Sequence, residues 1–196
     1  VGDVIGCRGI GMMLGFMSAG FMKRIDPRIS MSLGFALLSL AGVWMMTFDL
    51  NVTMEILIAN SLIQGFAVGT IWVPLTVVAF DTLASKDRAE ASSVFHLLRN
   101  MGSSFFISLS IAEIVRTTGA NYSRMTEMIT PFNPALTMPG MTGAWSFDTV
   151  PGLAKVTNEI ARQSAMIGYL NAFMMYAVTS ALAVVFVMMC RRKKAL

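Results

Sequence analysis

One apolar segment, residues 91–115, carries a polar stripe that holds the side chains best suited to chemistry. At 100° per residue these side chains share a sector about 100° wide on a helix; they are Ser92, His96, Arg99, Asn100, Ser103 and Ser110. Polar stripes of membrane helices face protein or a water-filled cavity. Arg99 lies about 12 Å into the segment, where a bare cation costs roughly 2.5–3.5 kcal/mol. Arg99 is therefore either a cavity-lining organiser of substrate or of a proton-relay carboxylate, or a structural group that pins this helix to a neighbour.

The remaining candidates are weaker. His96 titrates near neutrality and could relay protons, yet it lies one turn from the segment end, where an ordinary hydrogen-bonded histidine is the simpler interpretation. Gln64, near the middle of residues 56–80, is either a substrate contact or a hydrogen-bonding group between helices. Trp72 and Asn100 are further candidate contacts to substrate or to a neighbouring helix.

Several functions are not expected from these residues. The chain has one histidine and two cysteines, Cys7 and Cys190, which fall in different segments, so we expect no metal site. No nucleophile–base pair, phosphate-binding glycine loop or carboxylate pair stands out, so we expect neither an enzyme nor a cofactor. The net charge of +4 does not indicate nucleic-acid binding, because most cations cluster beside apolar runs, as in membrane proteins.

Composition identifies the environment of these residues. Only 13% of the 196 residues are charged, 55% belong to the set AVILMFWYC, and the mean hydropathy is +0.66. Soluble domains carry about 25% charged residues, and a soluble globule of this length could not bury so much apolar surface. The fold class expected is an all-α membrane protein with five transmembrane helices. The predicted spans are 4–22, 29–48, 56–80, 91–115 and 163–190.

The cations predict the orientation of the spans. Clusters at residues 23–28, 86–88 and 191–194 fall on one side of the membrane, which the positive-inside rule makes cytoplasmic. The C-terminus is then cytoplasmic, and a long loop over 116–162 lies outside. Pro151 and the helical spacing that follows predict a helix from about Gly152 into the last span. Because the chain begins almost inside an apolar run, we expect a fragment without its N-terminal part.

Glycine and proline mark features of helix packing. Gly11 and Gly15 form one GxxxG pair and Gly65 and Gly69 form another, and such pairs let helix backbones approach closely. Pro74 removes a backbone hydrogen bond and can kink its helix.

The loop between the first two spans reads Lys23-Arg24-Ile25-Asp26-Pro27-Arg28 and mixes charges of both signs. It is either a cytoplasmic gate, closed by salt bridges through Asp26 and Arg28, or a cluster that only sets orientation.

Three ordered stretches carry a family resemblance. They are Arg8-Gly9-Ile10-Gly11 with the loop at 23–28, Ile63-Gln64-Gly65-Phe66-Ala67-Val68-Gly69 with Val73-Pro74-Leu75-Thr76, and Phe95-His96-Leu97-Leu98-Arg99-Asn100-Met101-Gly102. Together they resemble the C-terminal part of EmrB/QacA-type drug:proton antiporters, the fourteen-helix branch of the major facilitator superfamily. The long outer loop and Thr130-Pro131-Phe132-Asn133 favour the EmrB side. By this resemblance residues 1–196 are the last five helices, part of the C-terminal half.

The resemblance implies proton-driven export of small hydrophobic drugs across the inner membrane, with the proton gradient as energy source. It implies as partners the missing N-terminal half of the same polypeptide, a periplasmic membrane-fusion adaptor and an outer-membrane channel. It also places Asp26 and Arg28 at the second-half counterpart of the family's cytoplasmic gate, although the loop departs from the full motif. The alternatives are a metabolite or siderophore exporter of the same superfamily and a stand-alone five-span membrane assembly subunit.

Overall fold

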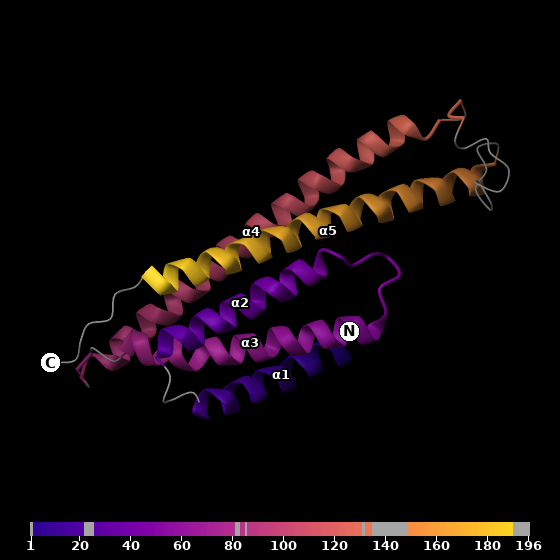
Figure 1. The fold of residues 1–196 in the computed structure, drawn as a ribbon. Coiled ribbons are helices and arrows are strands. Elements are labelled where there is room, and N and C mark those ends of the chain that lie inside the picture. The colour runs from indigo at the N-terminus through magenta and orange to yellow at the C-terminus, as the bar shows by residue number, and fades with distance from the viewer. Residues whose placement is uncertain are drawn as a thin grey trace. The chain divides into compact units, whose positions relative to one another are not determined.

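The computed structural model describes residues 2–21, 26–80, 83–84, 86–130, 132–134 and 149–189. Five helices follow one another along these residues, and no strand occurs among them (Figure 1). The all-α membrane fold is therefore confirmed. The helices are α1 (Gly2–Phe21), α2 (Pro27–Met45), α3 (Met54–Phe80), α4 (Arg88–Met128) and α5 (Val150–Met189).

The chain divides into two compact units. The first contains residues 1–105 and 173–196, and the second contains residues 106–172. Helices α4 and α5 each contribute to both units, and each unit is described by itself below.

Three of the described helices are long and apolar enough to cross a membrane, namely α2, α3 and α5. A lipid bilayer is the environment that such helices fit. The spans expected over 4–22 and 91–115 do form helices, α1 and α4. Both contain charged residues, Arg8 in α1 and Arg99 and Glu113 in α4, and their crossing of the membrane stays a prediction.

In the first unit α3 lies between α1 and α2, and the two GxxxG pairs form its contact with α1 (Figure 1). A Cβ atom built on Gly15 would lie 2.8 Å from the Cα of Gly69, and one on Gly69 would lie 2.9 Å from the Cα of Gly15. Gly11 and Gly65 face backbone carbonyls of the opposite helix in the same way. Any side chain at these positions would separate the backbones, so the predicted close packing of the two pairs is confirmed.

The contact between α2 and α3 combines an apolar core with a buried hydrogen bond. Leu38, Ala67 and Ile71 form the buried cluster. Asn60, only 2% exposed, donates from its side-chain amide to the backbone carbonyl of Ala41 at 3.1 Å. The hydrogen bond satisfies an amide that would be costly to bury alone.

Pro74 lies inside α3 and leaves the carbonyl of Thr70 without its usual helical donor. The hydroxyl of Ser30, on α2, donates to that carbonyl at 3.5 Å, and both residues are 3% exposed. The neighbouring helix therefore supplies the donor that proline lacks. Hydroxyls of this kind make proline tolerable in membrane helices.

Changing Ser30 to alanine is expected to lower the stability of the protein by about 1 kcal/mol, because a buried carbonyl loses its donor. In a Pro74→Ala background the same change should cost almost nothing, since the alanine introduced there can donate its own backbone N–H to the carbonyl of Thr70. Melting temperatures of the four proteins of this double-mutant cycle, purified in detergent, measure the difference. Equal losses in the two backgrounds would contradict the assignment of Ser30 as the replacement donor.

The outer segment differs from the expected loop over 116–162. Helix α4 continues to Met128, and α5 begins at Val150. Residues 116–128 contain no proline, so their polar composition alone does not end the helix; the first proline after α4 is Pro131. The helix predicted from about Gly152 into the last span is confirmed by α5. Residues 135–148 lie outside the described residues.

Within the second unit, α4 and α5 pack against each other around a glycine. A Cβ on Gly168 would lie 3.0 Å from the backbone carbonyl oxygen of Ile114, and it would also meet the hydroxyl of Thr118. Ser164, on α5, is fully buried and donates to the sulfur of Met125 at 3.4 Å. With about 1.5 Å per residue, helices of 41 and 40 residues are roughly 60 Å long. That length is about twice a hydrocarbon core.

Candidate functional site

Arg99 and Trp72 come together in the first unit from different helices. The guanidinium carbon of Arg99, on α4, lies 4.4 Å from the ring centroid of Trp72, on α3. Trp72 is half-buried and Arg99 is exposed. A guanidinium over an indole face gains about 0.5–1 kcal/mol at an exposed site and about 2 when desolvated. The contact therefore offsets part of the cost of placing Arg99 in a membrane.

The contact with Trp72 leaves the N–H donors of Arg99 available to a ligand. A guanidinium that stacks on a ring keeps its N–H donors at its edge, and five such donors suit carboxylates and other planar acceptors. Trp72 adds an apolar surface beside them. The pair thus offers a cation and an aromatic surface at one place, which fits the interpretation of Arg99 as an organiser. It equally fixes α4 to α3, as the structural interpretation requires.

His96 and Asn100 are exposed on α4 in the described chain. The ring of His96 lies 5.7 Å from that of Phe95, and the ring of Phe95 lies 5.6 Å from that of Phe80, near the end of α3, both in edge-on geometry. These contacts join the start of α4 to the end of α3. Their role in proton relay or substrate binding stays a prediction.

Gln64 is placed as a group that joins helices. Its side-chain amide nitrogen donates to the side-chain oxygen Oδ1 of Asn60, on the same helix, and lies 3.0 Å from the sulfur of Met45, on α2. Both amide hydrogens therefore have acceptors within the protein. This geometry favours helix packing over substrate contact for Gln64. Asn60 itself is a buried hydrogen-bonding residue. The sequence signal for its role is its position one helical turn before Gln64, which places both side chains on one face of α3.

Asp26 and Arg28 mark the start of α2. Asp26 is the N-cap residue, Pro27 follows it at the first helical position, and the backbone N–H of Ile29 donates to the Asp26 carbonyl at 2.9 Å. Acidic N-caps and early prolines are typical helix starts. Lys23 and Arg24, the other charges of this loop, lie outside the described residues. The gate role stays a prediction.

A pocket of about 490 Å³ lies between the end of α3 and the start of α4. Its lining is apolar apart from two carboxylates, Asp87 and Glu90. Sequence reasoning missed it, because the pocket depends on how the two helices meet. Its residues are Ala79, Phe80, Leu83, Asp87, Glu90, Ala91, Val94, Phe95 and Leu98.

The described residues do not bring together three potential metal ligands from His, Cys, Asp and Glu. No family model matches the chain, and no solved structure matches it either.

Curated relatives do match. The probable multidrug resistance protein EmrY of Escherichia coli K12 is 28% identical over 167 residues, which cover 84% of this chain and 33% of that protein. The multidrug export protein EmrB of Haemophilus influenzae is 30% identical over 115 residues, and EmrB of Escherichia coli K12 is 26% identical over 115 residues. These two matches cover 58% of this chain and 22% of each relative. The chain spans a third or less of the length of these relatives. The resemblance to EmrB-type proteins is therefore confirmed: the chain is a homologue of part of the multidrug proteins EmrB and EmrY.

Proposed function

We propose that the chain is the C-terminal portion of a proton-driven multidrug efflux transporter, which exchanges drugs for protons across the inner membrane. The observation that carries the proposal is the similarity over 167 residues to a protein named for multidrug resistance. Two features of the structure support it. Three of the described helices, α2, α3 and α5, are long and apolar, and the cation–aromatic pair of Arg99 and Trp72 joins one of them, α3, to α4. The activity proposed is transport and not catalysis.

The role of Arg99 and Trp72 in such a transporter follows from their chemistry. Small hydrophobic drugs commonly combine a flat ring with a polar or charged group. Trp72 offers a surface on which a ring stacks, and the N–H groups of Arg99 bind acceptors beside it. Transporter sites lie where two halves meet. The other wall of the site would come from the N-terminal half of the same polypeptide.

The proposed partners follow from the length of α4 and α5. Helices of 41 and 40 residues exceed a hydrocarbon core of about 30 Å. The excess lies on the outer side if the cation clusters and the C-terminus are cytoplasmic. The packed segments 106–128 and 150–172 would then offer a periplasmic adaptor a helical surface, and the adaptor would connect to an outer-membrane channel.

The test uses the complete gene, expressed in a bacterial strain that lacks its main efflux pumps. The transporter should raise resistance to several chemically unrelated hydrophobic drugs and speed the efflux of a fluorescent dye such as ethidium. Adding a protonophore should stop the efflux. Unchanged resistance to a broad drug panel, with the protein verified in the membrane, would refute drug export. Efflux that continues without a proton gradient would refute the proton coupling alone.

A further inference from the structure

The second unit contains a carboxylate in a helix–helix contact. Glu113 is half-buried on α4, at the end of an apolar run. Its Oε1 accepts a hydrogen bond of 3.0 Å from the hydroxyl of Thr117. The side-chain amide of Asn171, on α5, donates to that hydroxyl at 3.5 Å. These hydrogen bonds connect the carboxylate of one helix to the other helix through Thr117.

The charges around Glu113 leave it without a fixed counter-ion. Among the described residues Glu113 forms no ion pair. On α4, Arg116 is one turn away and exposed. On α5, which packs against this part of α4, residues 163–189 contain no charged side chain, and the titratable group closest in sequence to Asn171 is the exposed Tyr169.

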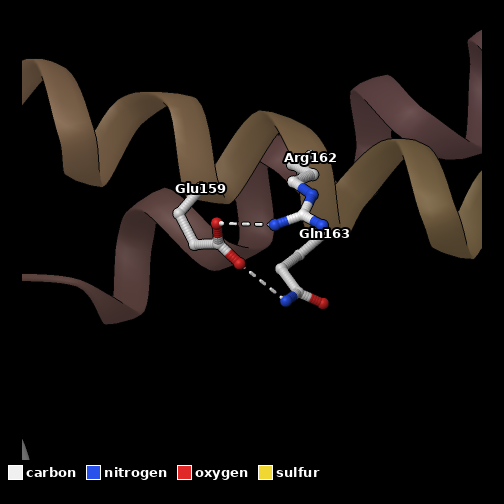
Figure 2. A network of polar contacts seen from close by, with 3 residues as sticks. All are labelled: Glu159, Arg162 and Gln163. Carbon is white, nitrogen blue, oxygen red and sulfur yellow. Dashed lines mark hydrogen bonds and ion pairs between the residues drawn. The ribbon is translucent and has the colours of Figure 1, made fainter. Parts of the chain in front are cut away.

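Another carboxylate of the second unit shows the contrast. Glu159, on α5, pairs with Arg162 at 3.8 Å and accepts from the amide of Gln163 at 2.8 Å (Figure 2). The three residues lie within five positions of one helix; Glu159 is half-buried, and Arg162 and Gln163 are exposed. Such surface pairs contribute little beyond local helix support. The charge of Glu159 is thus paired with a cation of its own helix. Glu113, in contrast, is connected to a second helix by the neutral side chains of Thr117 and Asn171.

The groups around Glu113 fit a proton and not a metal ion. The Thr117 hydroxyl donates to the carboxylate and the Asn171 amide donates to Thr117, whereas a metal ion needs several oxygen ligands. A hydroxyl can also accept a hydrogen bond, so Thr117 can partner both the ionised and the protonated form of Glu113. We propose that Glu113 is a proton-binding site and that its protonation changes the hydrogen bonds between α4 and α5. This inference rests on the proposed function, because it assigns the coupling proton of the antiporter to this residue.

Protonation of Glu113 exchanges donors and acceptors between Glu113 and Thr117 and leaves none of them unpaired. Thr117 has one hydroxyl proton and two lone pairs. When Glu113 is ionised, Thr117 donates to it. When Glu113 takes up a proton, its new O–H donates to the Thr117 oxygen, and the Thr117 proton turns to the carbonyl one turn back. Hydroxyls elsewhere in these helices already bond in this way, for example Thr126 to the carbonyl of Tyr122 at 2.8 Å.

The position suits proton entry from outside. Glu113 lies 25 residues after Arg88, where α4 begins. About 20 helical residues cross a hydrocarbon core. With the start of α4 on the cytoplasmic side, Glu113 is at the outer end of its span. A proton driving efflux must be taken up on that side.

The first test measures proton binding directly. Infrared difference spectra of the complete protein in lipid vesicles, recorded between alkaline and acidic buffer, should contain a carboxylic-acid C=O band that Glu113→Gln lacks. Glu127→Gln, at the exposed far end of the same helix, should keep the band. Thr117→Val should shift the band because the acid loses its hydrogen-bond partner, and Thr117→Ser should restore it. A Glu113→Gln spectrum identical to that of the wild type would overturn the proposal.

The second test measures coupling and separates the two proposals. An imposed pH gradient should drive drug uptake by inside-out vesicles with wild-type protein, and Glu113→Gln should lose at least nine-tenths of it while drug exchange without a gradient persists. Gradient-driven uptake retained by Glu113→Gln would overturn the coupling role. A wild-type protein that transports no drug would refute the proposed function, and the infrared band would still decide whether Glu113 binds a proton.

Discussion

Replacing Gly15 with leucine is expected to remove most of the folded protein from the membrane. A Cβ at this position would lie 2.8 Å from the Cα of Gly69 and 3.0 Å from the N of Thr70. Those atoms belong to the backbone of α3 and cannot turn aside as a side chain could. Overpacking a core usually costs about 1–3 kcal/mol, and here a whole helix must shift, so we expect a loss at or above about 3 kcal/mol.

Gly9 provides the matched control on the same helix. A Cβ on Gly9 meets no atom within 4 Å in the described structure, so Gly9→Leu makes the same change of residue type at a position where no backbone atom of α3 is close to the Cβ. The measurement is the amount of monodisperse protein after detergent extraction, with its melting temperature. Gly15→Ala should fall between the wild type and Gly15→Leu. Equal yields and melting temperatures for Gly9→Leu and Gly15→Leu would show that α1 and α3 do not pack through this glycine.

The glycine contact also shows which part of the fold a sequence can predict. Two glycines four residues apart lie on one face of one helix by the geometry of the helix alone, so close packing was predictable. Which helix they would meet was not, because that depends on contacts between distant segments. Gly168 also lies close to a neighbouring helix, at Ile114 and Thr118, but a single glycine forms no sequence pattern.

The end of α4 and the contact of Arg99 with Trp72 show further limits of prediction from the sequence. The end of the apolar run at residue 115 and the prolines from Pro131 onward suggested a loop. The helix nevertheless continues to Met128, because polar residues are compatible with a helix, and Gly119 is accommodated within it. The polar stripe of α4 followed from periodicity. The contact of Arg99 with Trp72 did not, because periodicity within one helix says nothing about its rotation against another.

Arg99→Ala is expected to lower drug efflux by the complete transporter at least tenfold, at an unchanged amount of protein in the membrane. The loss follows if the guanidinium binds substrate or organises the site. Protein amounts should hold because the substitution also removes a cation whose insertion costs roughly 2.5–3.5 kcal/mol, which offsets the lost contact with Trp72. Arg99→Lys should recover only part of the efflux, since an ammonium lacks the planar fork of donors and stacks poorly.

A double-mutant cycle with Trp72 decides whether the two residues act together. The guanidinium lies 4.4 Å from the ring centroid, so Trp72→Ala should release Arg99 and lower efflux almost as much as Arg99→Ala does. The double variant should then be no worse than Arg99→Ala, because interacting residues are not additive. Trp72→Phe, which keeps an aromatic face, should retain an intermediate rate. If the efflux losses of the two single variants multiply in the double variant, Arg99 acts without the ring. Reduced amounts of protein in both single variants would favour the structural role, in which the pair holds α4 against α3.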